Sequence, residues 1–312
     1  MRTDYFEFNG ANNTKLPAVL WQPEGEINAI LQITHGMTEH IGRYEAFAEY
    51  MTRHGVAVAG FDLRGHGKNP GNQTVTSLGV GGWQASIEDM RIFRRLLAER
   101  LPDRPHYMLG FSLGSFLLRE YLGSDTDSLA GAIIMGTGHQ PAAVLSVLRL
   151  IVKGQIKKAG FGNTTDLVRQ LSFGTYNQKF KPNRTTADWL CADAKQLDAY
   201  LEDTLCRKDI SADLFWELLG SMQRTGSKNA YDHWNKNLPV LLISGQDDPV
   251  GDCGKGVLTV CDRMHKAGIT KATMKMFPAA RHDLLHEDVS GVSEQARTDI
   301  CAGCRGKSNN GT

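Results

Sequence analysis

Two kinds of hydrophobic pattern alternate along the chain, and they predict where its strands and helices lie. Short, largely apolar runs rich in β-branched or aromatic residues are typical of strands buried on both faces of a sheet. Such runs occupy 29–35, 56–63, 106–111, 131–137, 239–245 and 272–277, and earlier runs at 5–9 and 16–22 predict an antiparallel hairpin. Helical patterns lie between them, including residues 43–55, which end on a glycine suited to a helix C-cap, and residues 83–101. The alternation predicts an α/β fold with a mostly parallel, eight-stranded sheet and helices on both faces.

Residues 138–234 interrupt this alternation, because they show helical patterns but no convincing strand. The interval is too long for an ordinary crossover, so we expect an inserted helical cap. The predicted organisation is a core in two parts, the cap between them, and a polar C-terminal tail: 1–137, 138–234, 235–300 and 301–312.

The cap opens with a stretch at 141–160 that has a stripe of apolar residues and three lysines beyond it. One interpretation is a helix packed over the core, and the other is a partly exposed helix that touches lipid aggregates. The stripe and the lysines are Val144, Leu145, Val147, Leu148, Ile151, Lys153, Lys157 and Lys158.

Composition excludes several classes of protein. The 312 residues are 41% hydrophobic, enough for a sizeable core, and the net charge of +1 with no basic block gives no reason to expect nucleic-acid binding. The first residues, MRTDYFEFNG, lack the apolar region of a signal peptide, and no run of about 18 apolar residues occurs, so we expect a soluble, cytoplasmic protein. The six cysteines are irregularly spaced, which argues against a disulfide framework, and we expect Cys301 and Cys304 to be a frayed, reduced pair in the tail.

The stretch GFSLGSF at 110–116 contains a G-x-S-x-G motif, and Ser112 is a candidate nucleophile. A nucleophile elbow needs a strand, a tight turn and a helix, because that geometry raises the serine hydroxyl above the sheet edge. The run HYMLGF supplies the strand, and the residues after Ser112 read as the start of a helix. Gly110 and Gly114 allow the strained turn and the close packing that a Cβ would obstruct.

A serine nucleophile needs a base oriented by an acid, and both are available in the expected chain order. The loop after the strand at 239–245 offers Asp247, Asp248 and Asp252. The loop after the strand at 272–277 offers His282 at its end, and His286 one helical turn later, where we expect it to face solvent. His282 is therefore the candidate base.

An oxyanion hole needs two backbone N–H donors directed at the developing charge. Leu113, directly after the nucleophile, provides one candidate. Met37 provides the other, since it lies in the loop after the strand at 29–35, where Gly36 allows a close approach of the backbone.

Residues 34–71 resemble the early signature of the monoacylglycerol lipase and lysophospholipase branch of the α/β-hydrolase superfamily. With GFSLGSF, ISGQDDPVG and AARHDLLHE, the resemblance extends over about residues 5–290. Members of this branch usually read GHSMGG at the elbow, whereas this chain has Phe111, Leu113 and Ser115, which leaves the substrate open. The matching early positions are His35-Gly36, Glu39-His40, Arg43-Tyr44, Gly55, Asp62 and Arg64-Gly65-His66-Gly67.

The resemblance implies a Ser–Asp–His triad in which Asp248 is the acid, with Asp247 as the fallback. It implies hydrolysis of acyl esters of glycerol or glycerophospholipids with no metal or organic cofactor, and a helical cap over the acyl pocket. We expect Arg64, His66 and the Glu39-His40-Arg43 group to brace neighbouring loops, and residues 173–190 to supply pocket walls.

The leading hypothesis is a serine carboxylester hydrolase acting on monoacylglycerol or lysophospholipid through an acyl-enzyme. It includes transient contact between the cap and lipid surfaces. A serine aminopeptidase or amidase with the same triad is the alternative enzyme, and it would need carboxylates in the cap to hold a free amino terminus. A ligand-binding, non-catalytic member of the fold is the third reading. The oligomeric state stays open. The candidate cap carboxylates are Asp188, Asp193, Asp198, Glu202 and Asp203.

Overall fold

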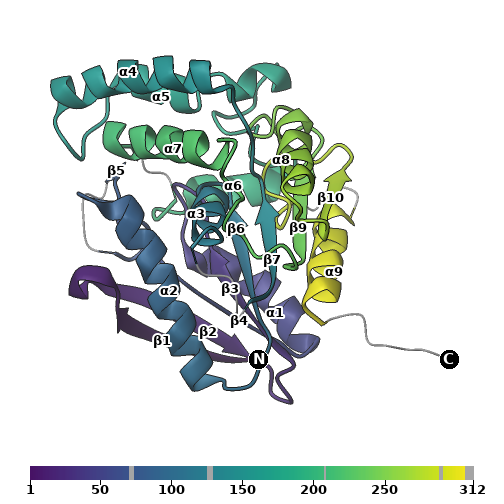
Figure 1. Cartoon of the computed structure of the whole chain (residues 1–312). Helices are drawn as coiled ribbons and strands as arrows, with labels where there is room; N and C mark the ends of the chain where they lie inside the picture. Colours follow the sequence, from purple (N-terminus) through teal and green to yellow (C-terminus); the bar gives the residue numbers. More distant parts are fainter. Residues whose placement is uncertain (70–73, 125–128, 207–208, 288–290, 306–312) are drawn as a thin grey trace.

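The computed structural model describes residues 1–69, 74–124, 129–206, 209–287 and 291–305, and its centre is one twisted sheet (Figure 1). The strand order is β1-β2-β4-β3-β6-β7-β9-β10; β1, β2 and β4 pair antiparallel and the remaining neighbours pair parallel. The eight predicted strands are confirmed, with shifts of a few residues at their ends. Their bounds are β1 Arg2–Asn9, β2 Lys15–Gln22, β3 Ala29–Thr34, β4 Val56–Phe61, β6 His106–Phe111, β7 Leu129–Met135, β9 Val240–Gly245 and β10 Ala272–Phe277.

Helices cover both faces of this sheet, as the alternating pattern predicted. One face carries α2 (Gly82–Arg100), α3 (Leu113–Tyr121) and α8 (Lys255–Lys266); the other carries α1 (Glu45–Arg53) and α9 (Val292–Arg305). The helix α1 ends just before Gly55, whose φ of +79° is the left-handed conformation typical of a glycine C-cap.

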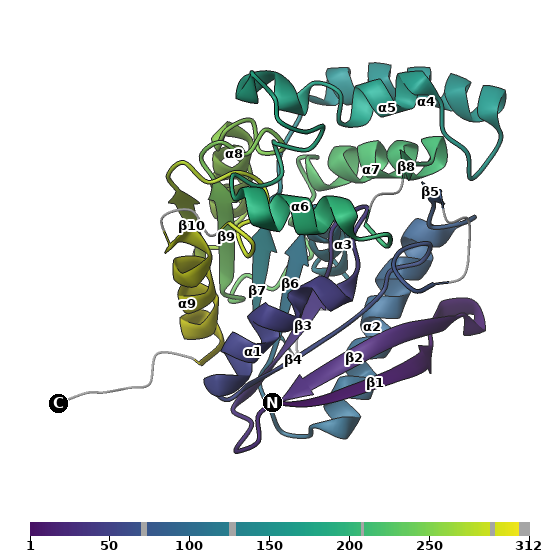
Figure 2. The ribbon, with the colours of Figure 1, turned by 180° about the vertical axis from the view of Figure 1, so that it is seen from behind.

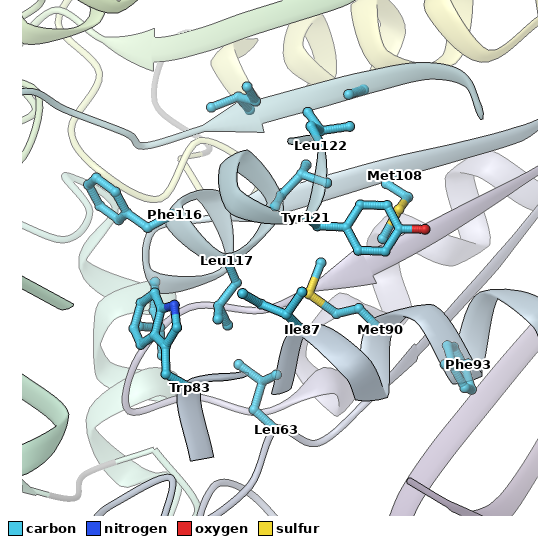
Figure 3. Close-up of a cluster of buried hydrophobic side chains, with 14 of the residues drawn as sticks. Leu63, Trp83, Ile87, Met90, Phe93, Met108, Phe116, Leu117, Tyr121 and Leu122 are labelled. Atoms are coloured by element: carbon cyan, nitrogen blue, oxygen red, sulfur yellow. The ribbon is translucent and has the colours of Figure 1, made fainter. Parts of the chain in front are cut away.

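The apolar face of α2 packs against α3 in the cluster shown in Figure 3. Fully burying each of these large side chains stabilises the fold by about 1.5–3 kcal/mol. The cluster fixes α3, and therefore the turn that precedes it, against the sheet. Its members include Trp83, Ile87, Met90, Phe93, Phe116, Leu117, Tyr121 and Leu122.

The segment between β7 and β9 lies above the edge where the parallel strands end (Figures 1 and 2). Its short strand β8 (Asp209–Ile210) pairs with β5 (Val75–Thr76) of the core, a pairing that the sequence pattern did not predict. Buried Arg119 of α3 also joins the two parts, because its guanidinium donates to the carbonyls of Gly138 and Thr225. The helices of the segment between β7 and β9 are α4 (Ala142–Ala159), α5 (Asp166–Ser172), α6 (Ala194–Glu202) and α7 (Ala212–Thr225), with the 3₁₀ helix η3 at Tyr176–Phe180.

The predicted polar tail begins too early. Residues 301–305 form the last part of α9, and both Cys301 and Cys304 are buried, free thiols on the helix face that packs against the sheet. The spacing of three residues places both side chains on one side of a helix, so they continue the apolar stripe begun by Ala296 and Ile300. The prediction of a frayed pair was therefore wrong, and residues 306–312 lie outside the described part.

Candidate active site

Ser112 occupies a sharp turn between β6 and α3, with φ +50° and ψ −116°. A positive φ is unusual for a residue with a side chain, and such strain clusters at functional sites. Gly110 and Gly114 are required by close packing: a Cβ on Gly110 would lie 2.4 Å from the carbonyl oxygen of Gly114, and a Cβ on Gly114 would lie 2.0 Å from the carbonyl oxygen of Thr34. The strand–turn–helix predicted from the sequence is thus present.

Asp248 and His282 lie together beside this turn, although they come from different loops. His282 Nδ1 lies 2.9 Å from Asp248 Oδ2, and both side chains are buried. The other carboxylate oxygen of Asp248 accepts a 2.9 Å bond from the N–H of Val250, so the acid is held on both sides. His282 Nε2 is buried and has no hydrogen-bond partner among the described residues. Its Nδ1–H is therefore engaged with an acid, while Nε2 is free to accept a proton.

Asp247, the alternative acid, points to a different partner. It is half-buried and forms an ion pair with Lys179 of η3, 2.6 Å between Oδ1 and Nζ. Asp252 is exposed. Of the three candidate acids, the structure brings Asp248 to His282.

The loop after β3 brings Met37 to the same place. Met37, Ser112 and His282 all line one cavity of about 20 Å³, which is room for about one water molecule. Leu113 is the first residue of α3, so its N–H has no acceptor within the helix. The residues proposed for the nucleophile, the base and the two oxyanion donors are therefore neighbours.

Aromatic side chains surround the candidate base. The ring of Phe111 lies 4.8 Å from the His282 ring, and that of Trp189 lies 5.2 Å from it, measured between centroids. Phe111, one of the three positions where this elbow departs from GHSMGG, also contacts Gly36, where a Cβ would lie 3.0 Å from its ring. The departure places an aromatic ring against the histidine.

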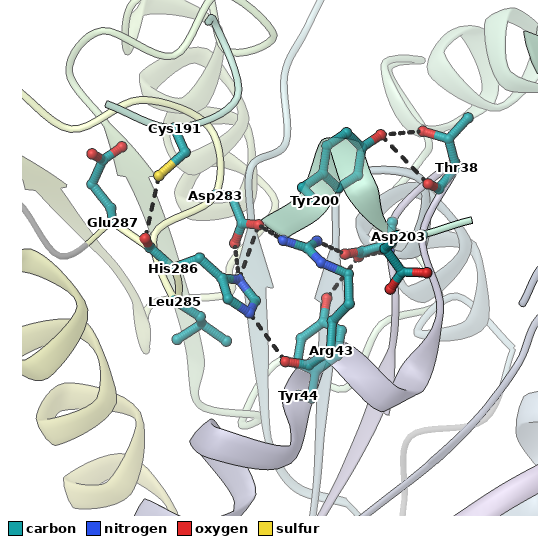
Figure 4. Close-up of polar contacts among 12 residues, drawn as sticks. Thr38, Arg43, Tyr44, Cys191, Tyr200, Asp203, Asp283, Leu285, His286 and Glu287 are labelled. Carbon is teal, nitrogen blue, oxygen red and sulfur yellow. Dashed lines mark hydrogen bonds and ion pairs between the residues drawn. The ribbon is translucent and has the colours of Figure 1, made fainter. Parts of the chain in front are cut away.

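Four cap residues line the cavity, and the sequence did not single them out: Phe173, Trp189, Leu190 and Tyr200. The aromatic density of residues 173–190 pointed to pocket walls but not to individual side chains. Tyr200 lies on α6, and its hydroxyl lies 3.0 Å from Thr38 Oγ1 in the loop after β3 (Figure 4).

A buried ionic network holds that loop. Glu39 Oε1 accepts bonds from the N–H of Gly36 (2.5 Å) and the hydroxyl of Tyr44 (2.9 Å), while its other oxygen pairs with Arg43. Arg43 also lies 2.9 Å from Asp283 Oδ2 (Figure 4). Burial lowers the pKa of Arg43, but the two carboxylates outweigh it and raise the pKa above the usual range. The bracing role predicted for Glu39 and Arg43 is confirmed.

His286 belongs to this network, and the expectation that it faces solvent was wrong. Its Nδ1 lies 2.9 Å from Asp283 Oδ1, and its Nε2 donates to the carbonyl oxygen of Arg43 at 3.0 Å (Figure 4). Both ring nitrogens of His286 therefore have oxygen partners. Burial raises the pKa of Asp283, but the charges of His286 and Arg43 hold it well below its usual range. The acid–histidine spacing within RHDLLHE was the available signal.

The other predicted bracing residues also have structural partners. Arg64 forms an ion pair with buried Asp89 of α2, 2.6 Å from Nε to Oδ2, and donates to the carbonyl of Ala11. His66 Nδ1 lies 2.8 Å from the carbonyl oxygen of Arg64. His35 donates through Nδ1 to the carbonyl of Gly36 and accepts the N–H of Leu63 at Nε2.

Comparison with known proteins shows the family to which the chain belongs. The family model described as serine aminopeptidase, S33, matches residues 25–289. The chain belongs to this family.

Within the family, the monoglyceride lipase of Rattus norvegicus is 24% identical over 90% of this chain and 83% of its own length. The monoacylglycerol lipase of Mycolicibacterium smegmatis is 27% identical over 90% of both chains. The chain also matches a quarter of the length of a Dictyostelium discoideum abhydrolase domain-containing protein, at 27% identity.

Solved structures show the same fold. A thermostable carboxyl esterase from Bacillus coagulans superimposes with a TM-score of 0.85 at 23% identity, covering 97% of each chain. A soluble variant of the Saccharomyces cerevisiae monoglyceride lipase superimposes with a TM-score of 0.71 at 17% identity over 96% of this chain and 92% of its own. This S33 family member is an α/β-hydrolase of the monoacylglycerol lipase-like branch, and it is a serine ester hydrolase.

Proposed function

We propose that the protein hydrolyses acyl esters with Ser112 as nucleophile, His282 as base and Asp248 as the acid that orients His282. The observation that carries this proposal is the 2.9 Å Asp248–His282 bond beside a cavity that Ser112 also lines, with His282 Nε2 left free. Ser112 attacks the ester carbonyl and His282 takes its proton. The N–H groups of Met37 and Leu113 stabilise the oxyanion. His282 then protonates the leaving alcohol, and water deacylates the enzyme by the same steps.

Ester substrates are favoured over aminoacyl ones by the positions of the cap carboxylates, several of which are engaged elsewhere. Asp193 caps the N-terminus of α6, Asp198 pairs with Arg184, and Asp203 pairs with His40. None of the cap's described carboxylates lines the cavity with Ser112. A free amino terminus would therefore lack the anchor that an aminopeptidase needs.

An uncharged head group suits the cavity better than a phosphate. Arg43 is the one cation among the described residues that line it, and its charge is matched by Glu39 and Asp283. A lysophospholipid phosphate would bring a further negative charge with no free partner there. We therefore propose a monoacylglycerol in preference to a lysophospholipid.

Substrate entry requires the cap to move. A cavity of about 20 Å³ does not admit an acyl ester, so at least one of the four cap residues that line it must be displaced. The first cap helix, α4, exposes Val144, Val147 and Leu150, which supports transient contact with a lipid surface during this step. No helix in the described ranges has both the length and the apolar character to cross a membrane.

A panel of purified substrates tests the proposal. Monoacylglycerols of several chain lengths, the matching lysophospholipids and aminoacyl amides are compared with wild type and Ser112→Ala. We expect turnover of monoacylglycerols that Ser112→Ala abolishes. Preference for the amides would support the aminopeptidase instead, and ester turnover unchanged in Ser112→Ala would contradict the proposed nucleophile.

A further inference from the structure

Three metal-binding side chains meet outside the candidate active site: His40, Asp203 and Cys206. Each offers one ligand atom, and these atoms all lie within 4.8 Å of one another. His40 Nε2 already lies 2.7 Å from Asp203 Oδ2. None of the three lines the cavity that contains Ser112, so the proposed hydrolysis does not account for them.

The three donors come from two parts of the molecule. His40 is on the core, in extended backbone at the start of the 3₁₀ helix η2 (Ile41–Tyr44), three positions after Met37. Asp203 and Cys206 lie at the end of α6 in the cap. A turn there fixes both, since the N–H of Cys206 donates to the carbonyl of Asp203 and that of Leu205 donates to Asp203 Oδ1.

The donor types favour zinc over magnesium and calcium. Imidazole, carboxylate and thiolate are the ligands that Zn²⁺ takes, whereas Mg²⁺ and Ca²⁺ prefer oxygen donors alone. With bonds of about 2.0–2.3 Å, tetrahedral donors lie roughly 3.3–3.8 Å apart. The three ligand atoms, which lie within 4.8 Å of one another, reach that geometry by small shifts, with a water as fourth ligand.

The surroundings are compatible with a cation. Burial raises the pKa of Asp203, but its bonds with His40 and the N–H of Leu205 hold the value below the usual range, so the carboxylate is charged. Burial raises the pKa of Cys206, so binding replaces the thiol proton by the metal and releases it to solvent. Arg43 is close to Cys206, but Glu39 and Asp283 match its charge.

We propose that His40, Asp203 and Cys206 form a Zn²⁺ site that joins α6 to the loop carrying Met37. The His40–Asp203 bond and the Tyr200–Thr38 bond already link the same two segments. A metal bound there strengthens the link and slows displacement of the cap, so Zn²⁺ inhibits ester turnover. This inhibition rests on the proposed function, whereas the metal site does not.

Cobalt binding to the full chain tests the site directly. The protein is stripped of metal with a chelator and titrated with Co²⁺, whose thiolate complexes show a sulfur-to-metal charge-transfer band, and then with Zn²⁺ in a calorimeter. We expect one equivalent to bind with the band present in wild type. Cys206→Ser removes the band, and Asp203→Asn weakens binding by about tenfold or more. Cys253→Ser is the matched control, because Cys253 is an exposed thiol beside Asp247 and Lys179, and it keeps the band.

Hydrogen exchange and turnover test the consequence. Zn²⁺ is expected to slow amide exchange in residues 194–202 and to lower ester turnover in wild type and Cys253→Ser but not in Cys206→Ser.

A missing thiolate band, or a band of equal strength in Cys206→Ser, would overturn the site. Binding with neither slower exchange nor inhibition would overturn the link to the cap. If no ester is hydrolysed, the proposed function fails while the cobalt band and the exchange data still decide the site. Far-UV circular dichroism identifies a variant that does not fold, in which case Asp203→Asn provides the comparison.

Discussion

Two histidines four residues apart in the chain each pair with a carboxylate, and they differ in the partner of the second ring nitrogen. In each, histidine Nδ1 lies 2.9 Å from a buried aspartate: His282 with Asp248, and His286 with Asp283. The second nitrogen of His286 donates to the carbonyl of Arg43, whereas that of His282 has no partner within the described part of the chain. The difference separates a histidine that can accept a proton from one whose hydrogen bonds are complete.

The partners of the two aspartates follow the same division. Asp283 also forms an ion pair with Arg43, and Arg43 forms a second ion pair with Glu39. Glu39 in turn accepts a hydrogen bond from the N–H of Gly36. The His286 pair thus fixes the loop that carries Met37, while the His282 pair stands beside Ser112. One pair is suited to chemistry, and the other positions the backbone on which that chemistry depends.

Replacing each histidine breaks the comparison most directly. His282→Gln is expected to lower kcat for a monoacylglycerol by about 10⁶-fold, the size seen when a triad base is removed. His286→Gln is expected to keep turnover within about tenfold and to lower the free energy of unfolding by about 1–3 kcal/mol, because Asp283 loses a buried partner. Steady-state kinetics and urea unfolding measure the two effects. An equal loss of kcat in both variants would contradict the division.

Replacing Asp248 tests whether the His282 pair serves catalysis. Asp248→Asn is expected to lower kcat by about 10⁴-fold, because the amide no longer fixes the His282 tautomer or stabilises its charged form. The neighbouring Asp247→Asn, which only removes the ion pair with Lys179, is the control and should change kcat by less than about threefold. The reverse order of effects in the kinetic comparison would make Asp247 the acid.

Replacing Arg43 tests the network that contains the His286–Asp283 pair. Arg43→Met leaves two buried carboxylates without their cation and is expected to lower the free energy of unfolding by about 3–5 kcal/mol. Arg53 and Glu49 form the matched control, since they have the same i,i+4 spacing but are exposed. Arg53→Met should cost less than about 1 kcal/mol. Comparable urea midpoints for the two variants would argue against a bracing network.

A third histidine sharpens the comparison through pH. Burial lowers the pKa of His35 from 6.5 to about 4, so the folded protein keeps the ring neutral. Below pH 6.5 the unfolded chain takes up a proton that the folded chain does not, and stability falls until the pH reaches about 4. Urea unfolding at a series of pH values measures this loss of the free energy of unfolding. We expect the loss to be smaller by about 3 kcal/mol in His35→Gln. The exposed His265→Gln should retain the slope; a full slope in His35→Gln would contradict the buried, neutral ring.

Local pattern was sufficient for most of the fold and for the candidate triad. The strands are short buried runs with glycines near their ends, and the turns that follow them hold Ser112, Asp248 and His282, so periodicity and chain order located them. The sequence could not choose between Asp247 and Asp248 by itself, because adjacent residues differ only in the direction of their side chains. The resemblance to the lipase branch favoured Asp248, and the bond between Asp248 and His282 agrees with it.

Features that depend on long-range pairing were not predicted. The spacing of Asp283 and His286 was a signal for one contact of His286, but its other partner, the carbonyl of Arg43, is distant in the chain and was not predictable. Cys301 and Cys304 were assigned to a tail because polar residues follow them, yet their helical spacing places both on the buried face of α9. The same limit applies to His40 with Asp203 and Cys206, whose meeting depends on how the cap sits on the core.

Labelling with a fluorophosphonate tests the central claim most directly, because the probe reacts with a serine only when a base activates it. Intact-mass and peptide mapping are compared for wild type, His282→Gln, His286→Gln and Ser112→Ala. The account predicts one adduct on Ser112 in wild type and His286→Gln, and no adduct in the other two variants. An adduct on another serine, or labelling of His282→Gln at the wild-type rate, would contradict it.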